Sequence, residues 1–188
     1  MSLVPVVDQV RLRSGTDPES GHFATVLLPF SVAALSPTLS LIFSSGFRES
    51  QSGLVDLPSV TPSALREVCN FLRIAHDHYK NSSGNTFTVS SKKFLPRSES
   101  VLETLEAARF LDLHRLTELC CKVMAQHFDH LPEFLPSDVL PFELRMQILR
   151  RLGPIQLCKA ERSDFLQGEE CKNTKRYNQL WQRMARKR

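Results

Sequence analysis

The spacing of apolar residues at the start of the chain predicts strands followed by short helices. Apolar and polar residues alternate over 6–13 and again over 22–28, and the Ser, Gly, Asp and Pro residues between these stretches are typical of a turn. This pattern predicts a β-hairpin, and the short apolar stretch 53–58 predicts a third strand. Apolar residues over 35–43 recur at helical spacing, but Pro37 predicts two short helical pieces instead of one helix.

From Thr61 onward the apolar spacing is that of helices. Thr61 and Pro62 form a start signal, because the hydroxyl can cap the first turn and proline suits the first helical position. Ser98 is expected to cap a second helix that runs through Ala108. Apolar residues at i, i+3, i+4, i+7, i+8 and i+12 from Leu116 predict a third helix. The predicted fold class is α+β, with a small three-stranded sheet and several helices.

An amphipathic stretch begins at Leu140. Pro141 is expected in the first turn of a helix, where its missing N–H is not needed. The apolar stripe consists of Leu140, Leu144, Ile148 and Leu152, with Leu149 beside it, and Arg145, Arg150 and Arg151 are expected to face water. Gly153 predicts a turn before a second helix that carries Leu157. A module of about 50 residues hardly builds a core of its own, so the stripe must pack against something else.

Composition places the chain among folded globular proteins. It has 188 residues, 41% hydrophobic and 23% charged, which suffices for one medium core and a small appendage. No apolar run approaches the roughly 20 residues that span a bilayer, and the start lacks a signal-peptide pattern. We therefore expect a nuclear or cytoplasmic protein without membrane contact. The cysteines are scattered, which favours reduced thiols.

The basic charge lies toward the C-terminus. Residues 1–133 contain 12 Lys and Arg against 14 Asp and Glu, whereas residues 134–188 contain 12 against 6, so the net charges are −2 and +6. The end of the chain carries Arg183, Arg186, Lys187 and Arg188. A solvated terminus is the favoured interpretation, and binding to an acidic partner or to nucleic acid is the alternative.

No pattern predicts a catalytic, metal or cofactor site. His76 and His78 flank Asp77, but alternate residues of a helix point to different sides, and no third ligand follows at zinc-site spacing. Cys120 and Cys121 are favoured as ordinary thiols over a redox pair. The glycines form neither a phosphate loop nor a dinucleotide-binding motif. We therefore expect a protein that is not an enzyme.

Residues 1–131 resemble a BTB/POZ domain of the elongin C and Skp branch. The order of hairpin, short helices, third strand, long helix and helical pair is similar, and so are two stretches of sequence. These are Tyr79-Lys80-Asn81-Ser82-Ser83 and the run from Leu102 through Phe110-Leu111-Asp112. Elongin C stops soon after that run, whereas the helix that follows His114 resembles one that Skp adaptors carry.

This resemblance implies an adaptor with two binding surfaces. Such domains hold a cullin scaffold on one surface, expected here around 39–47, and the helical box of a substrate receptor on another. The implied partners are a cullin and other ligase subunits, with an elongin B-like ubiquitin-fold protein as a further candidate. A self-associating BTB scaffold is the least favoured alternative, because the elongin C and Skp branch lacks the larger dimerising extensions of other BTB proteins. The implied box-docking surface, extended along the following helix, consists of Tyr79, Leu102, Leu105, Phe110, Leu113, Leu116, Leu119 and Val123. The alternative for Leu105 is that it fills the domain's own core.

Residues 132–188 resemble an F-box module similar to that of elongin A. Leu140-Pro141-x-Glu143-Leu144, with Ile148, Leu149 and Leu152, fits the opening helix, and Gly153 to Leu157 fits the following turn and second helix. Asn178-Gln179-Leu180-Trp181 is similar to the signature that closes such modules. The stretch 163–172 has no counterpart.

Together the resemblances imply an adaptor subunit of a cullin-RING ubiquitin ligase, with the F-box-like module docked in cis. A short linker gives an effective concentration of about millimolar, which favours docking on the same chain. The alternative is a structural subunit of a nuclear, elongin-like transcription or chromatin assembly without ligase activity.

Overall fold

The protein is a mixed α and β chain that divides into two compact units. The computed structural model describes residues 8–17, 20–81, 94–130, 140–162, 178–179 and 182. Unit 1 is Met1–Cys120 and unit 2 is Cys121–Arg188, so the division falls within helix α6. The domain boundary expected after residue 131 lies outside the described residues.

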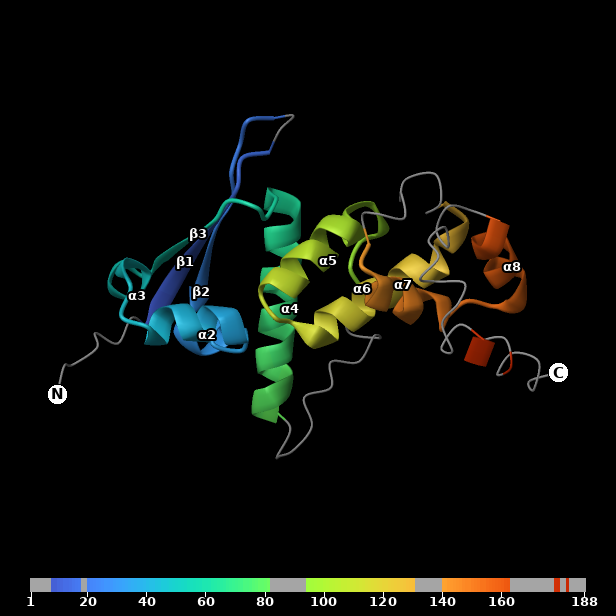
Figure 1. Cartoon of the computed structure of the whole chain (residues 1–188). Helices are drawn as coiled ribbons and strands as arrows, with labels where there is room; N and C mark the ends of the chain where they lie inside the picture. Colours follow the sequence, from blue (N-terminus) through green and yellow to red (C-terminus); the bar gives the residue numbers. More distant parts are fainter. Residues whose placement is uncertain are drawn as a thin grey trace. The chain divides into compact units, whose positions relative to one another are not determined.

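The predicted hairpin and third strand form one small sheet in unit 1 (Figure 1). Strand β1 (Gln9–Ser14) pairs antiparallel with β2 (Thr25–Pro29) and parallel with β3 (Leu54–Leu57), which gives the order β2-β1-β3. Alternate residues of β1 follow the strand period, because Val10 and Leu12 are completely buried while Arg11 is exposed. The sheet therefore has one face in the core of unit 1.

Three short helices lie between β2 and β3, and the predicted break at Pro37 is confirmed. They are α1 (Phe30–Ala33), α2 (Pro37–Ser44) and α3 (Arg48–Ser52). Ser36 caps α2, since its Oγ accepts a hydrogen bond from the Leu39 amide at 3.2 Å. The same hydroxyl is fully buried and donates to the Leu111 carbonyl at 2.7 Å. This side chain ties the start of α2 to a segment 75 residues away.

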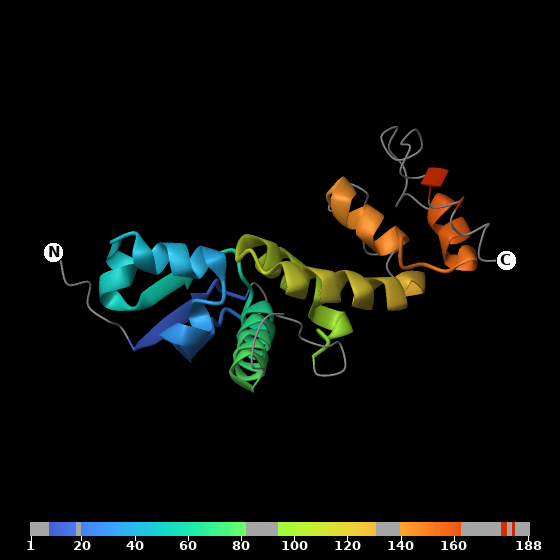
Figure 2. The ribbon, with the colours of Figure 1, turned by 90° about the horizontal axis from the view of Figure 1, so that it is seen from below.

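Helix α4 (Pro62–Asn81) is the longest described helix and begins where the sequence predicts. The Thr61 hydroxyl accepts a hydrogen bond from the Ala64 amide at 3.3 Å, as expected of an N-cap. The apolar face is buried and consists of Leu65, Val68, Cys69, Leu72 and Ala75. Figure 2 shows α4 nearly end-on. It packs against α1, β2 and α5.

The next helix starts later than predicted and ends in a tight turn. Ser98 is not its cap: Ser98–Ser100 form a 3₁₀ turn, η1, and α5 (Val101–Phe110) follows without a side-chain cap. At its other end Asp112 has φ 55°, and the Leu113 amide donates to the Ala108 carbonyl at 2.7 Å. A left-handed residue with this hydrogen bond is a Schellman-type end. It reverses the chain into α6 (His114–Gln126).

Unit 2 contains the second half of α6, the 3₁₀ turn η2 (Phe128–His130), α7 (Phe142–Leu149) and α8 (Pro154–Arg162). Pro141 precedes α7 as its N-cap residue, one position before the first turn where it was expected. The turn before α8 is closed by the Gly153 amide, which donates to Gln156 Oε1 at 3.2 Å. Lys159 of α8 pairs with Asp129 of η2 at 2.6 Å, which joins elements that are 30 residues apart.

Candidate protein-interaction site

The residues of the predicted box-docking surface differ widely in exposure. Leu105 and Leu116 are completely buried, in line with the core alternative for Leu105, whereas Phe110 is 50% exposed and Tyr79 is 67% exposed. Leu102 is half-buried, and the remaining predicted residues, Leu113, Leu119 and Val123, are buried. Of this set, only Val123 belongs to unit 2.

Phe110 owes its position to the end of α5. Its carbonyl accepts a hydrogen bond from Thr38 Oγ1 at 3.1 Å, next to the bond that Ser36 makes with Leu111. Two hydroxyls from the start of α2 therefore hold the last turn of α5. The Phe110 ring is half-exposed, while hydrogen bonds from Thr38 and Ser36 hold the backbone carbonyls of Phe110 and Leu111. An exposed aromatic ring on a well-held backbone is suited to contact with a partner protein.

The F-box-like stripe is buried throughout the described residues. Leu140, Leu144, Ile148, Leu149, Leu152 and Leu157 are each at most 6% exposed, while Pro141 is exposed. Leu140 and Leu152 flank α7 and are buried although neither is helical. Leu180, Trp181 and the basic residues Arg183, Arg186, Lys187 and Arg188 lie outside the described residues.

The prediction that Arg145 faces water is wrong. Arg150 and Arg151 are exposed as expected, but Arg145 is only 8% exposed. Helix α7 has only eight residues, and five of them are buried, including Leu144 and Met146 on either side of Arg145 in the sequence. The Arg145 side chain therefore has little access to water. Removing a guanidinium from water is costly, so the burial of Arg145 depends on the packing around it in unit 2.

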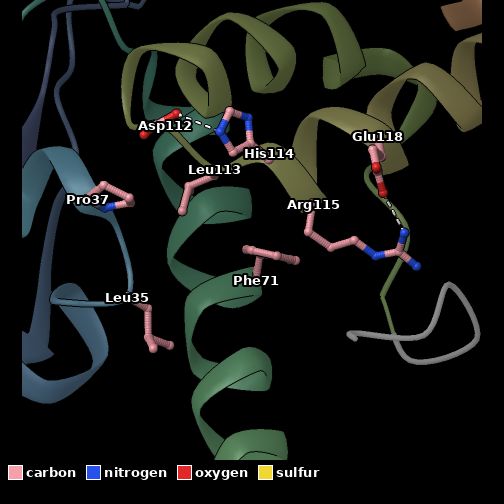
Figure 3. A pocket seen from close by; sticks show the side chains of 8 residues that line it. All are labelled: Leu35, Pro37, Phe71, Asp112, Leu113, His114, Arg115 and Glu118. Carbon is pink, nitrogen blue, oxygen red and sulfur yellow. Dashed lines mark hydrogen bonds and ion pairs between the residues drawn. The ribbon is translucent and has the colours of Figure 1, made fainter. Parts of the chain in front are cut away.

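A cavity of about 430 Å³ lies in unit 1 at the turn between α5 and α6. It is lined by Leu35, Pro37, Phe71, Asp112, Leu113, His114, Arg115 and Glu118 (Figure 3). Two ion pairs lie at the cavity: one joins Asp112 Oδ1 to His114 Nε2 at 3.2 Å, and the other joins Glu118 to Arg115. In Figure 3 Leu113 lies below the first pair, and Phe71 lies to the left of the Arg115 guanidinium.

Sequence reasoning missed Leu35, Pro37 and Phe71 as lining residues. Pro37 was recognised only as a helix break and Phe71 not at all, because the cavity depends on residues that are far apart in the chain. The sequence does show a change from apolar to polar residues after Leu113, where His114 and Arg115 start α6. This change could have indicated the turn at which the cavity lies.

The cysteine thiols of the described residues show no feature of a reactive centre. Burial raises the pKa of the Cys69 thiol to about 12, which keeps it protonated. Cys120 and Cys121 are both buried, and Cys158 is exposed. His76, Asp77 and His78 fall in α4, and among the described residues no three His, Cys, Asp or Glu side chains come together as a metal site. In the same residues no helix is long and apolar enough to cross a membrane.

The exposed sheet face carries one ordered charge cluster. Arg13 makes two hydrogen bonds to the Asp56 carboxylate at 2.6 and 2.7 Å, and its guanidinium lies 5.8 Å from the centre of the Phe23 ring. The hydrogen bond and the charge of Asp56 raise the pKa of Arg13. The pair is exposed, so it contributes little to stability.

Comparison with known proteins adds no assignment. No protein-family model matches the chain, and a search of curated proteins finds no significantly similar sequence.

Proposed function

We propose that the chain is a protein-interaction adaptor with a BTB/POZ-type domain over residues 1–131 and an F-box-like module over residues 132–188, and that it links a cullin to a substrate receptor in a ubiquitin ligase. The observation that carries the proposal is the order of the elements from β1 to α6. An antiparallel hairpin, short helices, a parallel third strand, a long helix and a helical pair follow in the order on which the resemblance to elongin C and Skp rests.

The burial pattern of unit 2 supports the docked F-box-like module. Full burial of a Leu or Ile side chain is worth about 1.5–3 kcal/mol, so the four stripe residues supply on the order of 10 kcal/mol before ordering costs. Unit 2 also contains Val123, Met124 and Phe128 from the second half of α6 and η2, all buried. We propose that α7 docks on this part of α6 in cis.

Exposed apolar side chains in unit 1 support a protein partner. Leu41 on α2 is 70% exposed and Phe47, directly before α3, is 62% exposed, whereas Leu39 and Phe43 of the same region are buried core residues. Leu41 and Phe47 lie in the region where the resemblance implies the cullin face. A few anchor residues carry most of the binding energy of a protein interface, so truncation of Leu41 and Phe47 tests whether they are anchors of this one.

The test is direct binding of the purified chain to purified cullin-RING complexes of different types, measured by biolayer interferometry. We expect one type to bind, and we expect L41S combined with F47S to weaken that binding at least about tenfold. I155S is the matched control, because Ile155 is a 76% exposed apolar residue in unit 2. The control should bind as the wild type does.

Two outcomes contradict the proposal. If no cullin type binds, the ligase role is wrong. If the chain from nuclear extract co-purifies with transcription or chromatin factors and no cullin, the elongin-like assembly without ligase activity replaces it.

A further inference from the structure

Two side-chain hydrogen bonds join the start of α2 directly to the end of α5. The Ser36 hydroxyl donates to the Leu111 carbonyl at 2.7 Å, and Thr38 Oγ1 donates to the Phe110 carbonyl at 3.1 Å. Both acceptors lie at the C-terminal end of α5, where the last carbonyls of a helix have no partner within the helix. The two side chains therefore complete the end of α5, and we call their bonds the α2–α5 clamp.

The clamp and the first turn of α2 depend on the same side chain. Ser36 is completely buried, and its hydroxyl accepts a hydrogen bond from the Leu39 amide while it donates to the Leu111 carbonyl. If the end of α5 moves away, this buried hydroxyl loses the acceptor for its proton, which is costly. If the start of α2 loosens, the Leu111 carbonyl loses its donor. The two helix ends are therefore expected to open together.

The end of α5 also carries a conformational cost that the clamp helps to offset. Asp112 has φ 55°, a left-handed conformation that is unfavourable for residues other than glycine. The turn is held because the Leu113 amide bonds the Ala108 carbonyl and because the clamp holds the two residues before Asp112. Removal of the clamp therefore shifts the last turn of α5 toward an open state.

Each of the joined helix ends carries an exposed apolar side chain. Leu41 lies about one turn after Thr38 on α2 and is 70% exposed, and Phe110, whose carbonyl the clamp holds, is 50% exposed. Leu41 belongs to the surface for which a cullin partner is proposed, and Phe110 belongs to the predicted box-docking surface. The clamp therefore links helix ends that belong to two different proposed binding surfaces.

We propose that the α2–α5 clamp couples these two surfaces. In the closed state both bonds are formed, as in this structure, and in the open state both are broken and the last turn of α5 is frayed. Leu41 and Phe110 are held in fixed positions only in the closed state, so a partner that covers either one favours that state. Each partner then raises the affinity for the other by the same factor. The link between the helices needs no partner, whereas the link between partners rests on the proposed function.

The first measurement follows amide hydrogen exchange in the free, full-length chain by NMR. L41G loosens α2 without removing a buried side chain, since glycine lowers helix propensity at this exposed position. The Leu113 amide, which bonds within the end of α5, should then exchange about fourfold faster than in the wild type. R48G is the matched control, because it places glycine in α3, which is not part of the clamp, and it should leave this amide unchanged.

Two variants of Thr38 show whether the effect passes through the clamp. T38V keeps the side-chain shape but removes the donor to the Phe110 carbonyl, so the further effect of L41G on the Leu113 amide should fall below about twofold. T38S keeps a donor and should restore the full response. Equal effects of L41G in the wild type and in T38V, or no effect in either, would overturn the clamp.

The second measurement adds the cullin-RING complex that binds in the test of the proposed function. Hydrogen exchange measured by mass spectrometry should slow at least about threefold in peptides over residues 106–113 of the wild type, and this slowing should be lost in T38V. Unchanged exchange in the bound wild type would contradict the coupling of the surfaces even if the clamp is present. If no cullin type binds, the proposed function fails and the coupling of partners fails with it, whereas the free-chain result still decides the clamp.

Discussion

Unit 1 and unit 2 are held together over different distances along the chain. In unit 1, Ser36 bonds Leu111 across 75 residues, and Arg13 pairs with Asp56 across 43. In unit 2, the Lys159–Asp129 pair joins residues 30 apart, and Arg151 and Gly153 each bond a residue three or four positions away. These side-chain bonds of unit 1 therefore reach further along the chain than the Lys159–Asp129 pair of unit 2, whose short helices also bury their apolar side chains.

The cores of the two units can be compared through their buried phenylalanines. Among the described residues, Phe71 of unit 1 is 1% exposed and Phe128 of unit 2 is 0% exposed, and both units also bury leucine or isoleucine side chains almost completely. Unit 2 is the shorter of the two units, so one large buried side chain makes up a larger share of its core. This contrast predicts that single substitutions affect unit 2 more selectively than unit 1.

The largest effect is expected for F128A. Truncation of a buried Phe costs about 3–5 kcal/mol, and unit 2 has no other side chain of that size completely buried in its described residues. Hydrogen exchange measured by mass spectrometry should become fast in peptides that cover α7 and α8, while α4 remains protected. F71A is the matched variant and should loosen α4 instead. Equal acceleration in both units by F128A would mean that they unfold as one, which would remove the contrast.

The sequence predicted features that depend on neighbouring residues and missed those that depend on distant ones. Thr61 and Pro62 predicted the start of α4 correctly, because an N-cap acts on the next three residues. The cap at Ser98 was wrong because the chain forms a 3₁₀ turn before α5. Nothing local could bring Leu35 together with Leu113 at the cavity. Arg145 was missed for the same reason, since its burial depends on the packing of unit 2.

The next largest effect is a pH dependence confined to unit 1. Burial raises the pKa of Cys69 from 9.0, its value in an unfolded chain, to about 12 in the folded protein. Above pH 9.0 the unfolded chain therefore releases a proton that the folded protein keeps. The stability that Cys69 contributes is complete well below pH 9.0 and is lost as pH rises, at about 1.4 kcal/mol per pH unit.

Urea unfolding of the wild type and of C69A between pH 7 and pH 10 measures this difference. At pH 10 the wild type should have lost about 1.4 kcal/mol more than C69A, relative to their values at pH 7. C158A is the control, because Cys158 is exposed, and it should follow the wild type. Parallel curves for the wild type and C69A would contradict the assignment.

The smallest effect compares how helices end in the two units. Asp112 ends α5 with φ 55°, a left-handed conformation that glycine adopts at less cost, whereas Arg150 ends α7 with φ −62°. D112G should therefore raise the free energy of unfolding by about 0.5–1 kcal/mol, and R150G should lower it by a similar amount. Thermal unfolding of both variants checks the signs. If D112G destabilises the protein, then the exposed Asp112–His114 pair, 3.2 Å apart, outweighs the backbone strain, and the end of α5 depends on the Asp112 side chain.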